Sequence, residues 1–264
     1  MSETSSGPML AADGTPLKRS LARALRREKL RAFLLIAPLL LFILVTFVAP
    51  IADMLFRSVE NNIVQETIPR TVQALRTWDP DESELPDSDT YLAFYTDLLF
   101  AEERKLHTRL GTRLNYEKTG ISSLFRKSGR RVGRFETDEY TKAYTRLNEA
   151  WEDPQTWAEV APQAGPRTAS AYATWAAVQI ENEDDPLTED PWDVLFANLH
   201  ADLSASDGYE LPLLEEARLA AASIEPVSIR AELEDVDEDW ADPDVWKTIQ
   251  TYAASYTPGY FLNS

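Results

Sequence analysis

The chain carries few of the side chains that enzymes use as nucleophiles or metal ligands. Its two histidines, His107 and His200, lie 93 residues apart, whereas a zinc site of the HExxH type needs two histidines four residues apart on one helix face. Cysteine is absent, which excludes thiolate nucleophiles, cysteine metal ligands and disulfide bonds. The motifs GxSxG, GxxxxGK and GxGxxG, which position a nucleophile or a phosphate, do not occur.

Carboxylates are the one abundant group, since the chain has 44 acidic residues. Glu215 with Glu216, and the run ELEDVDEDWADPD over residues 232–244, supply the paired acids that general acid–base catalysis requires. The stretch NEDDPLTEDPWD, residues 182–193, is dense enough to attract a cation but lacks the glycine and acid spacing of an EF-hand loop. Because such pairs arise by chance in so acidic a chain, we predict no catalytic residue, no metal or cofactor site and no enzymatic activity.

One segment is suited to a membrane. Residues 32–52, within RAFLLIAPLLLFILVTFVAPIADMLFRS, are twenty-one residues without a charge, and as a helix they cover about 31 Å, close to a bilayer's hydrocarbon thickness of roughly 30 Å. A buried core helix would need more apolar sequence around it, and a cleaved signal peptide has a shorter apolar run of roughly 7–15 residues. We therefore predict an uncleaved transmembrane helix over residues 32–56.

The charges on either side of this helix predict its orientation. The first 52 residues carry seven Lys or Arg and three acids, a net charge of +4. Because the whole chain has a net charge of −18, residues 53–264 have a net charge of −22. Basic flanks stay in the cytoplasm, so we predict a basic cytoplasmic segment over residues 1–31 and an acidic periplasmic domain over 57–264, in a bacterial inner membrane. Residues 17–33 have the pattern of an amphipathic helix on the lipid surface, although a simple basic flank is the favoured interpretation. The acidic domain should repel nucleic acid.

Apolar residues beyond the membrane segment recur at helical spacing, and the predicted fold class is all-α. Ser88 or Asp89 is expected to cap a helix, and residues 121–132 form a short basic helix that Gly129 ends or frays. Asp190 and Pro191 are expected to begin a further helix. The apolar faces expected of four helices comprise Tyr91, Phe94, Tyr95, Leu98 and Leu99; Phe135, Tyr140, Tyr144, Leu147 and Trp151; Tyr172, Trp175 and Val178; and Leu213, Leu214, Ala217 and Leu219.

The pattern W-x-D-P-x-x-W occurs twice, in WEDPQTW at residues 151–157 and WADPDVW at 240–246. Asp is expected to cap a helix, Pro to occupy its first turn, and the second Trp to lie one turn further on. TWDPDESEL, which begins at Thr77, repeats W-D-P without the second Trp. Internal duplication would require more than seven matching positions, so repeated use of a stable turn is favoured, with the tryptophans in the core.

Several stretches resemble the N-terminal part of permease subunits of binding-protein-dependent ABC transporters of the spermidine/putrescine type. They cover most of residues 32–151 and residues 239–264, while no match is found for residues 152–238. The segment LNYEKTGISSLFRK is more specific than the generic first helix. The resembling stretches are LLIAPLLLFILVTFVAPIADMLFRSV, TWDPDESELPDSDTYLAFYTDL, TRLNYEKTGISSLFRKSGRR and WADPDVWKTIQTYAASYTPGYFLNS.

The resemblance implies membership of a solute importer. Its partners would be a second permease subunit, cytoplasmic ATPase subunits, a periplasmic solute-binding protein and membrane lipid. The sequence lacks the other membrane helices and the coupling loop of such permeases, so it represents the first membrane helix and an enlarged first outer loop. The acidity could concentrate a polyamine, although solubility or adaptation to a saline habitat is the favoured explanation.

A second hypothesis comes from a different class of protein. In it the chain is a complete single-pass protein whose periplasmic domain binds a partner or scaffolds an envelope complex. The aromatic and apolar stretch SYTPGYFLNS favours the permease fragment, because a finished domain more often ends in polar, frayed residues.

Overall fold

The computed structural model describes residues 17–59, 62–181 and 192–253. Every regular element in these ranges is helical, which confirms the predicted all-α class. The chain divides into two compact units, residues 1–60 and residues 61–264. The first contains the apolar helix and the second contains the acidic domain.

The first unit holds one segment that is long and apolar enough to cross a membrane, Glu28–Met54. It lies within three consecutive helical elements, α1 (Leu17–Ile43), η1 (Leu44–Val48) and α2 (Ala49–Val59). The leucine, isoleucine and phenylalanine side chains of residues 33–51 are exposed, as the surface of a helix in lipid would be. The basic segment and the apolar segment therefore share one helix, α1.

The element η1 is a π-helical turn, in which the N–H of Ala49 donates to the carbonyl of Leu44, five residues earlier. Proline at position 50 explains why the helix widens here. Pro50 has no N–H for the carbonyl of Thr46, and its ring would collide with that carbonyl in a regular α-helix. A local π turn is one way for a membrane helix to accommodate a proline.

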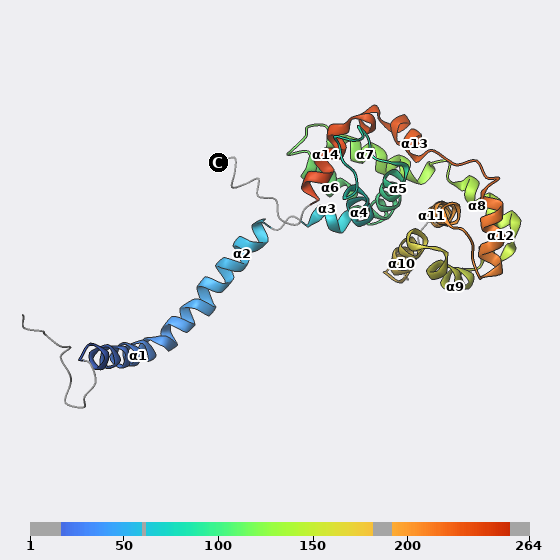
Figure 1. The fold of residues 1–264 in the computed structure, drawn as a ribbon. Helices are drawn as coiled ribbons and strands as arrows, with labels where there is room; N and C mark the ends of the chain where they lie inside the picture. The colour runs from blue at the N-terminus through green and yellow to red at the C-terminus, as the bar shows by residue number, and fades with distance from the viewer. Residues whose placement is uncertain (1–16, 60–61, 182–191, 254–264) are drawn as a thin grey trace, which may run out of the picture. The chain divides into compact units, whose positions relative to one another are not determined.

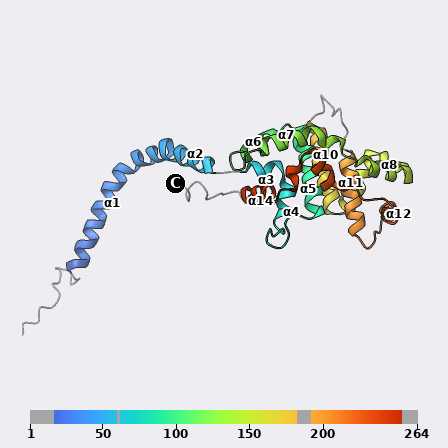
Figure 2. The same ribbon diagram turned by 90° about the horizontal axis from the view of Figure 1, so that it is seen from above.

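The second unit is built from two lobes (Figure 1), and the same grouping is seen in the view turned by 90° (Figure 2). The first lobe comprises α3 to α7 and, from the end of the chain, α13, η4 and α14. The second lobe comprises α8 to α12 and is inserted between α7 and α13. The helices of the first lobe are α3 (Ile63–Thr67), α4 (Pro69–Leu75), α5 (Ser88–Glu103), α6 (His107–Leu114), α7 (Ile121–Arg131), η2 (Val132–Arg134), α13 (Ile229–Val236), η4 (Glu238–Ala241) and α14 (Pro243–Tyr252). Those of the second lobe are α8 (Asp138–Leu147), η3 (Glu149–Glu152), α9 (Pro154–Ala164), α10 (Pro166–Glu181), α11 (Trp192–Ala205) and α12 (Pro212–Ala221).

Helix α5 is the centre of the first lobe. All five residues expected on its apolar face are buried, but Thr90, Thr96 and Asp97 are buried as well, so the helix is enclosed on nearly every side. Its N-cap is Asp87, whose side chain accepts from the N–H of Thr90 at 2.8 Å. The predicted caps, Ser88 and Asp89, are therefore wrong by one or two residues.

Other local predictions hold in part. Gly129 was expected to end or fray its helix, yet α7 continues through it to Arg131. A Cβ atom on Gly129 would lie 2.6 Å from the His107 ring, so this glycine permits close packing of α6 on α7.

Leu147 and Leu219 were expected in the core, but they are 37 % and 64 % exposed. Asp190 and Pro191 lie outside the described residues.

The two W-x-D-P-x-x-W segments adopt the same local fold. Each first Trp lies in a short 3-10 helix, and each Asp caps the following helix, as predicted: Asp153 accepts from Gln155 N–H and Asp242 from Asp244 N–H. The indole N–H of each second Trp donates to the carbonyl of the first at 3.0 Å, and the ring centroids of both pairs are 5.4 Å apart. All four tryptophans are fully buried. At Trp78, which has no second Trp, the chain makes a turn instead of a helix.

The first and last described helices of the second unit, α3 and α14, lie together. Helices α3 and α14 both contact α4 and α6, and they are side by side in both views (Figures 1 and 2). The amide of Gln250 on α14 donates to the carbonyls of Leu75 and Trp78. The chain therefore enters and leaves the described domain at one place in the first lobe.

The close approach at Gly129 yields a stability prediction. We expect Gly129→Ala to lower the free energy of unfolding by about 1–2 kcal/mol, because overpacking the buried His107 outweighs the better helix propensity of alanine. Urea unfolding of the full chain in detergent, followed by tryptophan fluorescence, measures the change, since all seven tryptophans lie beyond residue 60.

Gly208→Ala is the control for this substitution. There the new Cβ would meet nothing closer than Glu215 Oε2, at 3.8 Å, so stability should change by less than about 0.5 kcal/mol. Equal effects of the two substitutions would contradict the packing role assigned to Gly129.

Candidate functional site

The acidic run over residues 232–244 has a structural role. Asp237 and Asp242 cap helices, and three carboxylates of the run pair with basic residues of the segment 118–131. The pairs are Lys118 with Asp242 at 2.9 Å, Lys127 with Asp237 at 2.5 Å and Arg131 with Asp235 at 3.1 Å. The basic helix α7 and the acidic run are thus complementary faces of the first lobe.

The paired acids Glu215 and Glu216 are separately engaged. Glu215 accepts from Arg218 and from the N–H of Tyr209, and these two hydrogen bonds lower the pKa of Glu215 to about 2. Glu216 accepts from the side-chain amide of Asn148, which lies between α8 and η3. A carboxylate that is held ionised in this way is a poor general acid at neutral pH.

The histidines belong to different lobes. His107 is buried against α7, while His200 stacks on Tyr140 and shares a hydrogen bond of 2.9 Å with the hydroxyl of Tyr144. Burial lowers the pKa of His200. Among the described residues no group of three or more His, Asp or Glu is placed to hold a metal ion. The acidic stretch over residues 182–193 lies outside the described residues, except for Trp192 and Asp193, which begin α11.

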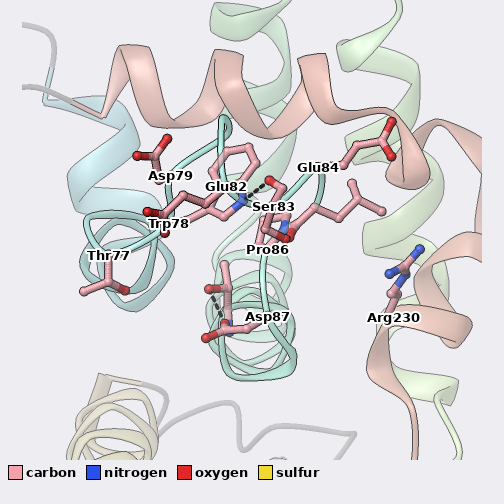
Figure 3. Close-up of a pocket in the computed structure, with 11 residues that line it drawn as sticks. Thr77, Trp78, Asp79, Glu82, Ser83, Glu84, Pro86, Asp87 and Arg230 are labelled. Carbon is pink, nitrogen blue, oxygen red and sulfur yellow. Dashed lines mark hydrogen bonds between the residues drawn. The ribbon is translucent and has the colours of Figure 1, made fainter.

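An acidic hollow of about 520 Å³ lies beside the loop that joins α4 to α5. Figure 3 shows four carboxylates around it, with Trp78 between them and Arg230 on the wall formed by α13. Asp87 is occupied by its capping bonds to Thr90, and Asp79 accepts from the N–H of Asp81. The hollow can attract a cation electrostatically, although two of its acids also serve the loop itself. The four carboxylates are those of Asp79, Glu82, Glu84 and Asp87.

The most constrained polar group of the first lobe is the carboxylate of Asp97. Helix α4 begins with Pro69, and Ile68 before it has no side chain that accepts a hydrogen bond. Asp97 on α5 takes that role from outside the helix: one of its oxygens accepts from both the N–H and the hydroxyl of Thr71 at 2.8 Å. Its other oxygen accepts from Arg70 Nη1 at 2.9 Å. Burial raises the pKa of Asp97 to about 6, and Arg70 and Thr71 oppose this shift.

The second lobe repeats this arrangement atom for atom. Helix α10 begins with Pro166, and one oxygen of Asp202 on α11 accepts from both the N–H and the hydroxyl of Thr168 at 2.8 Å. The other oxygen accepts from Arg167 Nη1 at 3.2 Å. Gly165 leaves space for the carboxylate, since a Cβ there would lie 2.4 Å from Asp202.

The second nitrogen of each arginine reaches the opposite lobe. Arg70 Nη2 donates to the carbonyl of Ser170 at 2.6 Å and to the hydroxyl of Thr174 at 2.5 Å. Arg167 Nη2 donates to the carboxylate of Asp89. A cavity of about 350 Å³, lined by both arginines, lies at this seam, and a second of about 360 Å³ extends from Arg167 to His200.

Sequence reasoning missed these residues. It weighed acids by their local density, whereas Asp97 and Asp202 are single acids within apolar helices. The available signal was the tripeptide Pro-Arg-Thr at residues 69–71 and 166–168, each followed by Thr-Trp at the same distance.

No protein family, curated protein or solved structure matches the chain.

The raised pKa of Asp97 predicts a pH dependence of stability. Its folded value of about 6 lies above the ordinary value of 3.8, so the folded state holds the proton more tightly, and this contribution to stability is lost as the pH rises between those values. We expect the free energy of unfolding, relative to that of Asp97→Asn, to fall between about pH 4 and pH 6.5.

Urea unfolding of both proteins across this pH range measures the difference. Acids other than Asp97 titrate in both proteins, so their contributions to the free energy of unfolding cancel to first order in the difference. A difference that stays constant with pH would show that the pKa of Asp97 is the same in the folded and unfolded states.

Proposed function

We propose that this chain is the N-terminal part of an ABC importer permease subunit, made up of its first membrane helix and an enlarged outer loop. The two-lobed domain would lie in the periplasm, where a solute-binding protein docks. A second permease subunit and cytoplasmic ATPase subunits would complete the transporter. The substrate class would be a small cationic solute of the polyamine type.

The observation that carries the proposal is the combination of one apolar helix with opposite charge on its two sides. The helix is long enough to cross a bilayer. Seven basic residues precede its uncharged stretch, residues 32–52, and the sequence beyond that stretch has a balance of −22. Basic residues on one flank favour a cytoplasmic N-terminus. The acidic hollow near Trp78 would raise the local concentration of a cationic solute.

The neighbouring positions of α3 and α14, the first and last described helices of the domain, support the same proposal. A domain that forms a loop between two membrane helices must receive and release the chain on one side. Helices α3 and α14 meet this requirement, because both contact α4 and α6. Neighbouring ends are also frequent in ordinary domains, so the argument depends on their combination with the membrane helix.

An antibody against the outer domain, used on native membranes, tests the proposal. A band well above 29.8 kDa, together with co-purification of an ABC-type ATPase, is the expected result. A band at 29.8 kDa with a co-purifying ATPase would indicate a split permease. A band at that mass without any ATPase would overturn the transport proposal in favour of a single-pass protein that binds a partner in the envelope.

The proposed orientation makes a separate prediction. Because the chain has no cysteine, one introduced thiol reports one position. We expect a membrane-impermeant maleimide to label Ser204→Cys, on the exposed surface of α11, in intact spheroplasts. Ser20→Cys, in the basic part of α1, should react only after permeabilisation, and its labelling in intact cells would contradict the orientation.

A further inference from the structure

The second unit contains two sets of residues that match in sequence, in order and in hydrogen bonding. PRTVQALRTW at residues 69–78 and PRTASAYATW at 166–175 share six of ten positions. NEAWEDPQTW at 148–157 and DEDWADPDVW at 237–246 share five of ten. Together they exceed the seven positions required above for a duplication, and the repeated-turn interpretation does not account for the first pair.

The matching residues make matching contacts. Asp97 and Asp202 hold the Pro-Arg-Thr segments through the same donors. An aromatic residue lies six positions before each aspartate: Tyr91 before Asp97, and Phe196 before Asp202. Each ring packs on the second Trp of a W-x-D-P-x-x-W segment. The ring centroids are 4.8 Å apart for Tyr91 and Trp246 and 4.9 Å apart for Phe196 and Trp157.

The element contacts follow the same correspondence. In the first lobe α4 packs on α5, α13 on α5 and α14 on α4; in the second lobe α10 packs on α11, α8 on α11 and α9 on α10. The chain order differs, because the Trp segment comes last in the first lobe and first in the second. Along the whole chain, however, the Pro-Arg-Thr segment, the aspartate and the Trp segment follow one another in the same order twice, at residues 69–157 and 166–246. A tandem duplication whose two copies have exchanged their Trp segments gives this arrangement.

We infer that the two lobes are copies of one ancestral unit and that Arg70 and Arg167, its equivalent arginines, form a reciprocal latch across the seam. Each guanidinium holds its own lobe's buried aspartate with one nitrogen and a group of the opposite lobe with the other. An arginine can do this because its planar fork presents several donors at once, whereas a lysine ammonium is a single point of charge. The latch limits how far the lobes separate.

Spin labels in a chain without cysteine measure that separation. Ser123→Cys on α7 and Ala158→Cys on α9 are exposed and lie in different lobes, so double electron–electron resonance on the full chain reports the distance between the lobes. In this background Asp89→Asn with Thr174→Val removes the charge and the hydroxyl that the two arginines contact in the opposite lobe, but leaves both arginines and both buried aspartates. We expect a broader distance distribution with an added longer population.

The matched control is Glu234→Gln with Thr248→Val. It removes the same charge and the same hydroxyl, but these groups bond within their own helices, to Arg230 and to the carbonyl of Asp244. Its distribution should equal that of the unmodified background. A seam variant that is indistinguishable from this control, with unchanged helicity, would overturn the latch.

A second pair of variants tests the equivalence of the two arginines. Arg70→Lys and Arg167→Lys each keep the charge beside the buried aspartate and lose one of the two arms. Each should broaden the distribution, and the double variant should broaden it further. If one substitution gives the full effect and the other none, the latch is not reciprocal, and if both only reduce helicity, the arginines serve the individual lobes alone.

Discussion

A carboxylate removed from water requires donors and an opposite charge, and Asp97 and Asp202 impose this requirement on the helices beside them. A proline begins each neighbouring helix and fixes its first turn, so the threonine two residues later has a free N–H to offer. The carboxylate takes this N–H, the threonine hydroxyl and one arm of the arginine. The position of α4 on α5, and of α10 on α11, follows from these bonds, and the remaining arm of each arginine defines the seam.

The parts of this fold that were predictable are those specified by short stretches of sequence. The membrane segment follows from length and apolarity, and the helix starts at Asp153 and Asp242 follow from adjacent residues. The interior of α5 was predictable only in part, because a hydrophobic pattern does not reveal that a helix is enclosed on all sides. Gly129 was misjudged for a similar reason: its neighbour, His107, comes from another helix.

The polar seam was not predictable by counting acids. Asp97 and Asp202 bond threonines 26 and 34 residues away, and neither acid stands in an acidic run. The acidic run over residues 232–244 instead serves the fold, through three ion pairs with the segment 118–131 and through its capping bonds. The repeated Pro-Arg-Thr segments were visible in the sequence, but their meaning depends on the two acids that complete them in space.

The inserted position of the second lobe has a consequence for biosynthesis. Tyr91 bonds the carbonyl of Trp240, 149 residues later, so the first lobe remains without part of its core while the whole second lobe is being translated. The second lobe is continuous in sequence and can close as soon as α12 is made. The lobe that is synthesised first is therefore completed last, and its aromatic residues need protection from aggregation for longer than those of any segment with local contacts.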